Sequence, residues 1–276
     1  MGKKNLRIVI ALFPEAKSLI KLYKLNEYNS AENIFKIYCN KNSNIWLVIS
    51  GIGNVNCASA TTYLYLKSPI INKNIWINFG MGGSNSLKVG EIYNIKKVTY
   101  KTRDKLESFY TSAIINTGLP IMNIFSVDSI EKRFKIKNTI YEMEAYGFMK
   151  TVERFCEREL ICIIKIISDN KFQSASNFVR KINSYIKPNL EKISDEIDNY
   201  VEISKNIINK KKIDTTIVEN KFHLTFNNKI IIKDLAEKII LAYSKKKLEN
   251  LLIESKSLDE FIKKMRHNIK NYKFNI

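Results

Sequence analysis

The stretch that decides the fold runs from residue 139 to 170 and reads TIYEMEAYGFMKTVERFCERELICIIKIISDN. It opens with two carboxylates, Glu142 and Glu144, on either side of Met143. Apolar residues then recur at the spacing of a half-buried helix. The nearly all-apolar, β-branched run 160–167 is typical of a strand buried on both faces. A helix followed by such a strand predicts an α/β fold.

That buried strand ends at Ser168 and Asp169. Open α/β sheets bind their ligands at the carboxyl ends of such strands. We therefore expect Asp169 to be a catalytic acid.

The first strand, residues 6–12, leads into Pro14 and Glu15. A proline suits the first turn of a helix, so Glu15 is expected near a helix N-terminus. A carboxylate there can be catalytic, or it can simply be favoured by the helix dipole.

Two further strands end in glycine-rich turns. Residues 45–50 run into Gly51-Ile52-Gly53, but Asn56 occupies the third glycine position of a dinucleotide motif, so a nicotinamide site is not favoured. Residues 75–79 open into the Gly-Met-Gly-Gly run 80–83, which indicates either close approach of backbone to a ligand or two sharp turns.

Beyond residue 147 the chain contains no glycine. Helical patterns occur around 235–241, 248–253 and 258–269, whereas 215–226 is expected to hold a short hairpin or strand. We therefore expect an α/β domain over residues 1–209 and a helical C-terminal extension over residues 210–276.

The 276-residue chain has a formal charge of +19, and 45% of its residues are hydrophobic. The cations are spread along the chain, which favours a solvated basic surface over a nucleic-acid-binding protein. The four cysteines lack metal or redox spacing and predict free thiols in the cytoplasm. Apolar runs are too short for a signal peptide or a membrane span. The two histidines lie far apart, so neither a metal site nor a cofactor is expected.

Taken in order, several segments resemble the nucleoside phosphorylase/nucleosidase superfamily over about residues 6–205. These segments are Glu15 after the first strand, GIGNVNCASAT, INFGMGG, LKVGEIY, SVDS, YEMEAYGF and KIISDN. The resemblance implies a three-layer sandwich around a twisted mixed sheet, and a homo-oligomer.

The resemblance also implies roles for individual residues. Asp169, preceded by Ser168, would protonate a purine base, and Glu15 would activate water. Glu144 would bind the ribose hydroxyls, with Met143 packed on the sugar and Glu142 beside them.

Hydrolysis is favoured over phosphorolysis, because Asn78 before Gly80 stands where phosphorylases carry a phosphate-binding arginine. The chain departs from the nucleosidase pattern at three positions. Met81 replaces a serine near the water, Lys165 replaces an arginine, and Ile130 stands where an aromatic ring would stack on the base.

Three hypotheses follow. The first is a nucleosidase acting on a purine-like nucleoside. The second is a phosphorylase in which Lys165 or a neighbouring subunit contacts phosphate. The third is a relative that binds a nucleoside or nucleic acid without turnover.

Overall fold

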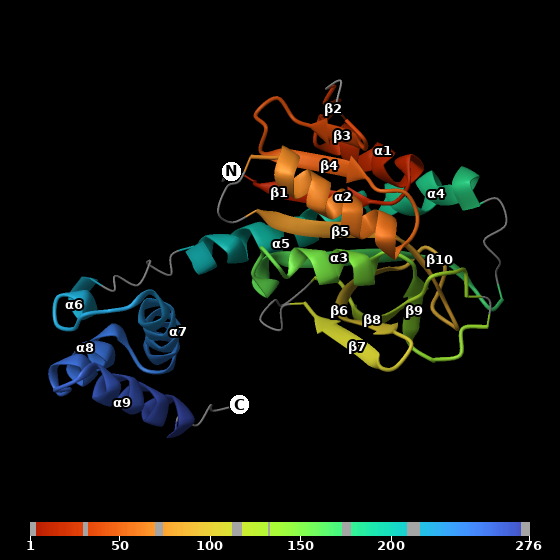
Figure 1. The fold of residues 1–276 in the computed structure, drawn as a ribbon. Coiled ribbons are helices and arrows are strands. Elements are labelled where there is room, and N and C mark those ends of the chain that lie inside the picture. The colour runs from red at the N-terminus through yellow and green to blue at the C-terminus, as the bar shows by residue number, and fades with distance from the viewer. Residues whose placement is uncertain are drawn as a thin grey trace. The chain divides into compact units, whose positions relative to one another are not determined.

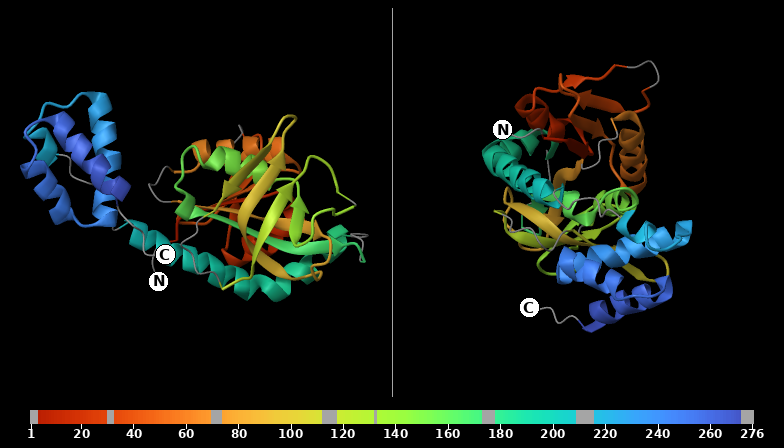
Figure 2. Two further views of the ribbon diagram at one scale, coloured as in Figure 1. Left: turned by 90° about the horizontal axis from the view of Figure 1, so that it is seen from below. Right: turned by 90° about the vertical axis from the view of Figure 1, so that its left-hand side faces the viewer.

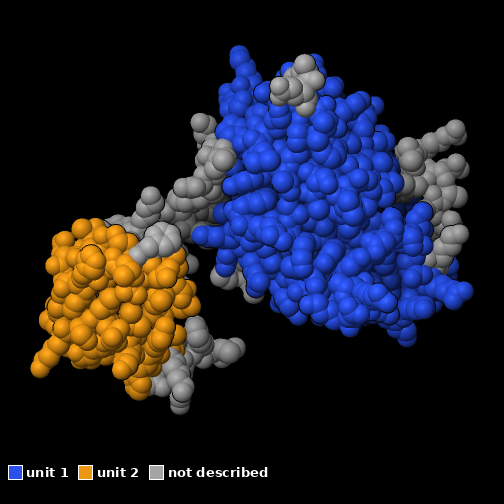
Figure 3. Space-filling model, in the orientation of Figure 1, with its two compact units in different colours: residues 1–207 blue, residues 208–276 orange. Residues whose placement is uncertain are grey.

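The computed structural model describes residues 4–29, 33–69, 74–111, 118–131, 133–172, 178–208 and 216–271. The chain divides into two compact units, Met1–Ile207 and Ile208–Ile276, which are coloured separately in Figure 3. Each has a hydrophobic core of its own.

The first unit is built on one ten-stranded mixed sheet, whose main path runs β10-β6-β8-β9-β5-β1-β4-β3-β2, with β7 paired to β6. An additional pairing of β10 with β5 closes β5, β9, β8, β6 and β10 into a ring. The strands are β1 (Leu6–Ile10), β2 (Asn26–Glu27), β3 (Lys36–Cys39), β4 (Ile45–Ile49), β5 (Ile75–Ser84), β6 (Ile92–Lys101), β7 (Leu106–Tyr110), β8 (Ile121–Ser126), β9 (Thr139–Glu142) and β10 (Ile161–Asn170).

Helices cover both faces of this sheet (Figures 1 and 2). One face packs against α1 (Phe13–Leu22), α4 (Phe178–Ile186) and α5 (Leu190–Ile208), and the other against α2 (Asn54–Lys67) and α3 (Ala145–Val152). Short 3-10 helices, η1 (Arg158–Leu160) and η2 (Lys187–Asn189), precede β10 and α5. The predicted α/β fold with helices around a central sheet is therefore confirmed.

Successive side chains of a strand point to opposite faces of the sheet, so a central strand such as β1 contributes to both hydrophobic cores. In β1, Leu6, Ile8 and Ile10 face α1, whereas Val9 faces α2. A strand covered on both faces has to be apolar at nearly every position, which explains the continuous apolar run in β10.

The second unit contains α6 (Thr216–Glu219), α7 (Phe226–Ala242), α8 (Lys245–Ile253) and α9 (Leu258–Asn271). Ile232, Ile239, Phe261 and Met265 are fully buried at its centre. The sequence-based expectation of a hairpin or strand over 215–226 was wrong. Among the described residues of this segment, 216–219 form α6, 220–225 contain no strand, and Phe226 begins α7. Within the described residues, no helix is both long enough and apolar enough to cross a membrane.

Candidate active site

Four parallel strands carry the predicted motifs toward one edge of the sheet. β1 pairs in parallel with β4 and β5, and β5 pairs in parallel with β10. Glu15 follows β1, the Gly51–Gly53 turn follows β4, Gly80–Gly83 lie late in β5, and Asp169 lies at the end of β10. This is the sheet edge at which α/β proteins bind ligands.

Glu15 is the third residue of α1, and its side chain turns back over the start of the helix. One oxygen, Oε2, accepts a hydrogen bond from the Leu12 N–H at 3.0 Å, and Oε1 accepts one from the Met81 N–H at 3.2 Å. The residue is only 4% exposed. Burial raises the pKa of Glu15 to about 7, although the charge of Lys165 opposes this. A carboxylate with this pKa can accept a proton from water near neutral pH.

Lys165 is buried in the sheet beside Glu15. Its Nζ forms an ion pair with Glu142 Oε2 at 2.9 Å. A Cβ atom built on Gly80 would lie 3.5 Å from both Glu15 Oε1 and Lys165 Nζ, so Gly80 packs directly beside both groups. Burial lowers the pKa of Lys165, but the charges of Glu142 and Glu144 outweigh it and the net shift is upward. Lys165 is therefore cationic in its buried site.

Glu144 is the N-cap residue of α3 and is 8% exposed. Its Oε1 accepts a hydrogen bond from the Gly53 N–H at 3.0 Å. Burial raises the pKa of Glu144; Lys165 opposes the shift and Glu142 adds to it. Glu15, Glu142, Glu144 and Lys165 thus form one buried group of interacting charges, which we call the acid–lysine cluster.

Asp169 lies outside the acid–lysine cluster. Ser168 Oγ donates a hydrogen bond to its Oδ1, and Asp169 Oδ2 would lie 3.0 Å from a Cβ built on Gly83. Burial raises the pKa of Asp169, and the Ser168 hydroxyl partly opposes this. Since Gly80 borders the cluster and Gly83 borders Asp169, the two sites are three residues apart along β5, about 10 Å.

The remaining predicted substrate-binding residues differ in their burial and contacts. Asn78 is buried, and its Nδ2 donates to the Val9 carbonyl at 3.2 Å. Met81 contributes its backbone N–H to Glu15 and is buried, and Met143 is half-buried. Ile130 is 77% exposed, so its side chain packs little against the protein.

Phe134 is an aromatic residue that sequence reasoning missed. It is 4% exposed, and its ring atoms would lie 2.7 Å from a Cβ on Gly83, on the side where Asp169 lies. Its backbone has φ +37°, an uncommon conformation for an aromatic residue. Asn85 Nδ2 holds this turn by donating to the Phe134 carbonyl at 2.8 Å. The ring therefore occupies the neighbourhood in which the family resemblance predicted an aromatic, four residues beyond Ile130.

Helices α2 and α3 touch at Gly147. A Cβ atom there would lie 2.0 Å from the Asn54 carbonyl oxygen, which is a hard clash with backbone. We expect Gly147→Ala to lower the free energy of unfolding by at least about 1–3 kcal/mol, as overpacking does elsewhere. Urea denaturation of this variant tests the contact. Alanine is the better helix former, so a measured loss of stability has to come from the clash with the Asn54 backbone.

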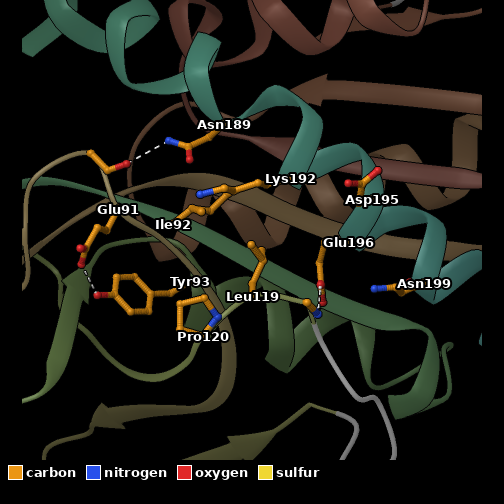
Figure 4. A pocket seen from close by; sticks show the side chains of 12 residues that line it. Glu91, Ile92, Tyr93, Leu119, Pro120, Asn189, Lys192, Asp195, Glu196 and Asn199 are labelled. Atoms are coloured by element: carbon orange, nitrogen blue, oxygen red, sulfur yellow. Dashed lines mark hydrogen bonds between the residues drawn. The ribbon is translucent and has the colours of Figure 1, made fainter.

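A cavity of about 580 Å³ lies elsewhere in the first unit (Figure 4). Side chains of α5, among them Lys192, Asp195 and Glu196, form one side of it, and residues 90–93 and 118–120 form the other. Glu196 accepts a hydrogen bond from the Gly118 N–H at 3.0 Å, so this carboxylate fastens the chain before β8 to α5. None of the predicted catalytic residues lines this cavity.

Among the described residues, no group of three or more His, Cys, Asp or Glu side chains could hold a metal ion.

No protein-family profile and no curated protein matches the sequence. Solved structures do match it. They include a 5'-methylthioadenosine/S-adenosylhomocysteine nucleosidase from Neisseria meningitidis in complex with methylthio-immucillin-A, at 17% identity and a TM-score of 0.54, covering 71% of this chain and 99% of that one.

Two Helicobacter pylori proteins are similar to the chain to the same degree. One is a 5'-methylthioadenosine/S-adenosylhomocysteine nucleosidase, at 17% identity and a TM-score of 0.57, covering 72% of this chain and 99% of its own. The other is a futalosine hydrolase, at 17% identity and a TM-score of 0.56, covering 72% of this chain and 98% of its own. The chain therefore has the fold of the nucleoside phosphorylase/nucleosidase superfamily.

Proposed function

We propose that this protein is a nucleosidase that hydrolyses the N-glycosidic bond of a purine-like nucleoside. The observation that carries the proposal is Glu15. This carboxylate is buried, is held by two backbone N–H groups and lies beside Gly80, and its burial raises its pKa to about 7. A general base with these properties is what activation of a water molecule requires.

In the proposed reaction, Glu15 takes a proton from water as the water oxygen attacks C1' of the ribose. The bond between C1' and the base nitrogen breaks, its electron pair goes to the base, and Asp169 gives the base a proton. The products are free ribose, with any 5' substituent, and the free base. A raised pKa supports this role for Asp169, because a general acid has to hold its proton at the start of the reaction.

Glu144 is proposed to accept hydrogen bonds from the ribose hydroxyls, with Met143 packed on the sugar. The ring of Phe134 is proposed to take the stacking role on the base, because it is the aromatic side chain packed beside Gly83 and Asp169. The similar nucleosidase structures were solved with nucleoside-analogue inhibitors, which supports a nucleoside as the substrate class.

The state of Lys165 favours hydrolysis over phosphorolysis. Its ammonium group is 1% exposed and paired with Glu142, so it is already neutralised by a carboxylate. A phosphate dianion placed beside the acid–lysine cluster would meet three carboxyl groups and one shared cation, which makes phosphate binding there unfavourable.

A nucleoside panel assayed with and without phosphate tests the proposal. We expect free base to be released in phosphate-free buffer, with ribose rather than ribose 1-phosphate as the second product. Strict dependence on phosphate would refute hydrolysis, and binding without release of base would refute catalysis.

A further inference from the structure

The first amide groups of α3 are satisfied by side chains from outside the helix. Glu142, in β9, begins this arrangement: its Oε2 accepts hydrogen bonds from the N–H groups of Glu144, at 3.1 Å, and Ala145, at 2.8 Å. The intrahelical ladder starts only with the Phe148 N–H, which donates to the Glu144 carbonyl at 3.0 Å. The N–H groups of the two residues in between need other acceptors.

Asn54 and Ser126 supply those acceptors. Ser126 Oγ, at the end of β8, accepts from the Tyr146 N–H at 3.4 Å. Asn54 Oδ1, at the start of α2, accepts from the Gly147 N–H at 3.0 Å and also from the Ser126 hydroxyl at 3.1 Å. Asn54, Ser126 and Gly147 are buried, so water cannot readily replace the bonds between them, whereas Tyr146 is half-buried.

Glu144 is the N-cap residue of α3, so its side chain would normally accept one of these N–H hydrogen bonds. An N-cap side chain usually accepts from the second or third N–H of its own helix, and the Gly147 N–H is the third in α3. Glu144 makes no such bond. Its oxygens instead accept from Gly53 at 3.0 Å and, more weakly, from Met143 at 3.4 Å.

We propose that Asn54, with Ser126, caps α3 in place of Glu144, and so keeps the Glu144 carboxylate turned out of its helix and available to substrate. Asn54 is then a positioning residue for Glu144. The structural part of this inference stands alone, and only its consequence for substrate binding rests on the proposed nucleosidase activity.

Removal of the Asn54 amide leaves the Gly147 N–H without its acceptor in a buried place. The Glu144 carboxylate, which belongs to the N-cap residue of α3, can turn toward this N–H and gains by moving to a helix N-terminus. Its movement into the cap withdraws it from the sugar site.

The first test compares a ribonucleoside with the matching 2'-deoxynucleoside. In Asn54→Ala we expect the ratio of kcat/KM between the two substrates to fall roughly tenfold, because a hydrogen bond to a charged group is lost only for the hydroxylated sugar. Asn54→Asp keeps the acceptor but loses the amide that donates to the Val127 carbonyl and to Asp128, so its ratio should lie between that of Asn54→Ala and that of the wild type. Asn56→Ala, an exposed position on α2 whose side chain donates to the Ile52 carbonyl, is the matched control and should leave the ratio unchanged. An equal loss for both substrates would overturn the positioning role.

The second test needs no activity. Thermal unfolding is measured for Glu144→Ala in the wild-type chain and in the Asn54→Ala chain. If Glu144 takes over the cap, its removal lowers Tm by about 2–4 °C more in the Asn54→Ala background than in the wild type. Purely additive shifts would overturn the proposal. If the wild-type protein cleaves no nucleoside, the proposed function is refuted. The Tm shifts of Glu144→Ala in the two backgrounds still test whether Glu144 takes over the cap.

Discussion

Asp169→Asn is expected to lower kcat by about 10²–10⁴, the usual contribution of a general acid. Asparagine keeps the size of the side chain and an oxygen able to accept from Ser168, but it has no proton to give to the leaving base. The base must then leave as an anion, which is slower because an anion is a poorer leaving group than the neutral base. Measurement of free-base release under saturating substrate checks this directly.

A substrate that needs no protonation separates this role from a structural one. A purine nucleoside methylated at N7 already carries a positive charge on its base, so Asp169→Asn should hydrolyse it at close to the wild-type rate. Asp195→Asn is the matched control, because Asp195 lines the cavity of Figure 4 and should be dispensable. Equal loss on both substrates, or a larger loss from Asp195→Asn, would contradict the assignment of Asp169.

Glu15→Gln is expected to remove a comparable factor of about 10²–10⁴ from kcat, because the amide cannot take a proton from water. In the wild type, the ionisation of Glu15 should give kcat/KM a rising limb near pH 7, since the pKa of Glu15 is raised to about 7 and only its ionised form acts as a base. Loss of the Asp169 proton should add a falling limb, because the general acid has to be protonated. The rising limb should be absent from the residual activity of Glu15→Gln. A rising limb that survives in this variant would assign the titration to another group.

The same carboxylate should destabilise the fold as the pH rises. The pKa of Glu15 is about 7 in the folded protein and 4.5 ordinarily, so the unfolded chain ionises first. Stability therefore falls between pH 4.5 and 7, by about 3 kcal/mol once both states are ionised. Glu15→Gln escapes this loss, and its Tm relative to the wild type should be several degrees higher at pH 8 than at pH 5. Glu27→Gln, on the exposed strand β2, should show no such trend.

Much of the α/β architecture could be predicted from the sequence. β10 is covered on both faces and therefore has to be continuously apolar, which makes it visible as the run 160–167. A turn that requires glycine, with Gly51 and Gly53 at positive φ, marks the end of β4. The predicted glycine-rich run 80–83 lies within β5 instead of forming turns. Periodic apolar spacing indicated α7, α8 and α9, because each has one buried stripe against a shared core.

The features of the site that the sequence did not reveal depend on contacts between residues distant in sequence. The family resemblance placed Ile130 where an aromatic ring stacks on the base, whereas a turn at Phe134 brings the Phe134 ring to Gly83. The sequence shows Lys165 as a cation near the site, but its burial against Glu142 is a property of paired strands. The segment 215–226 has too few residues for periodicity to distinguish a strand from the helical turn of α6.

The acid–lysine cluster has a consequence for the energetics of catalysis. It buries three carboxyl groups with a single ammonium group, so its electrostatic field is negative whenever at least two of those carboxyl groups are ionised. A neutral nucleoside gains little from that field. When positive charge develops on the ribose ring as the base departs, the same fixed charges attract it, so the protein stabilises the transition state more than the ground state.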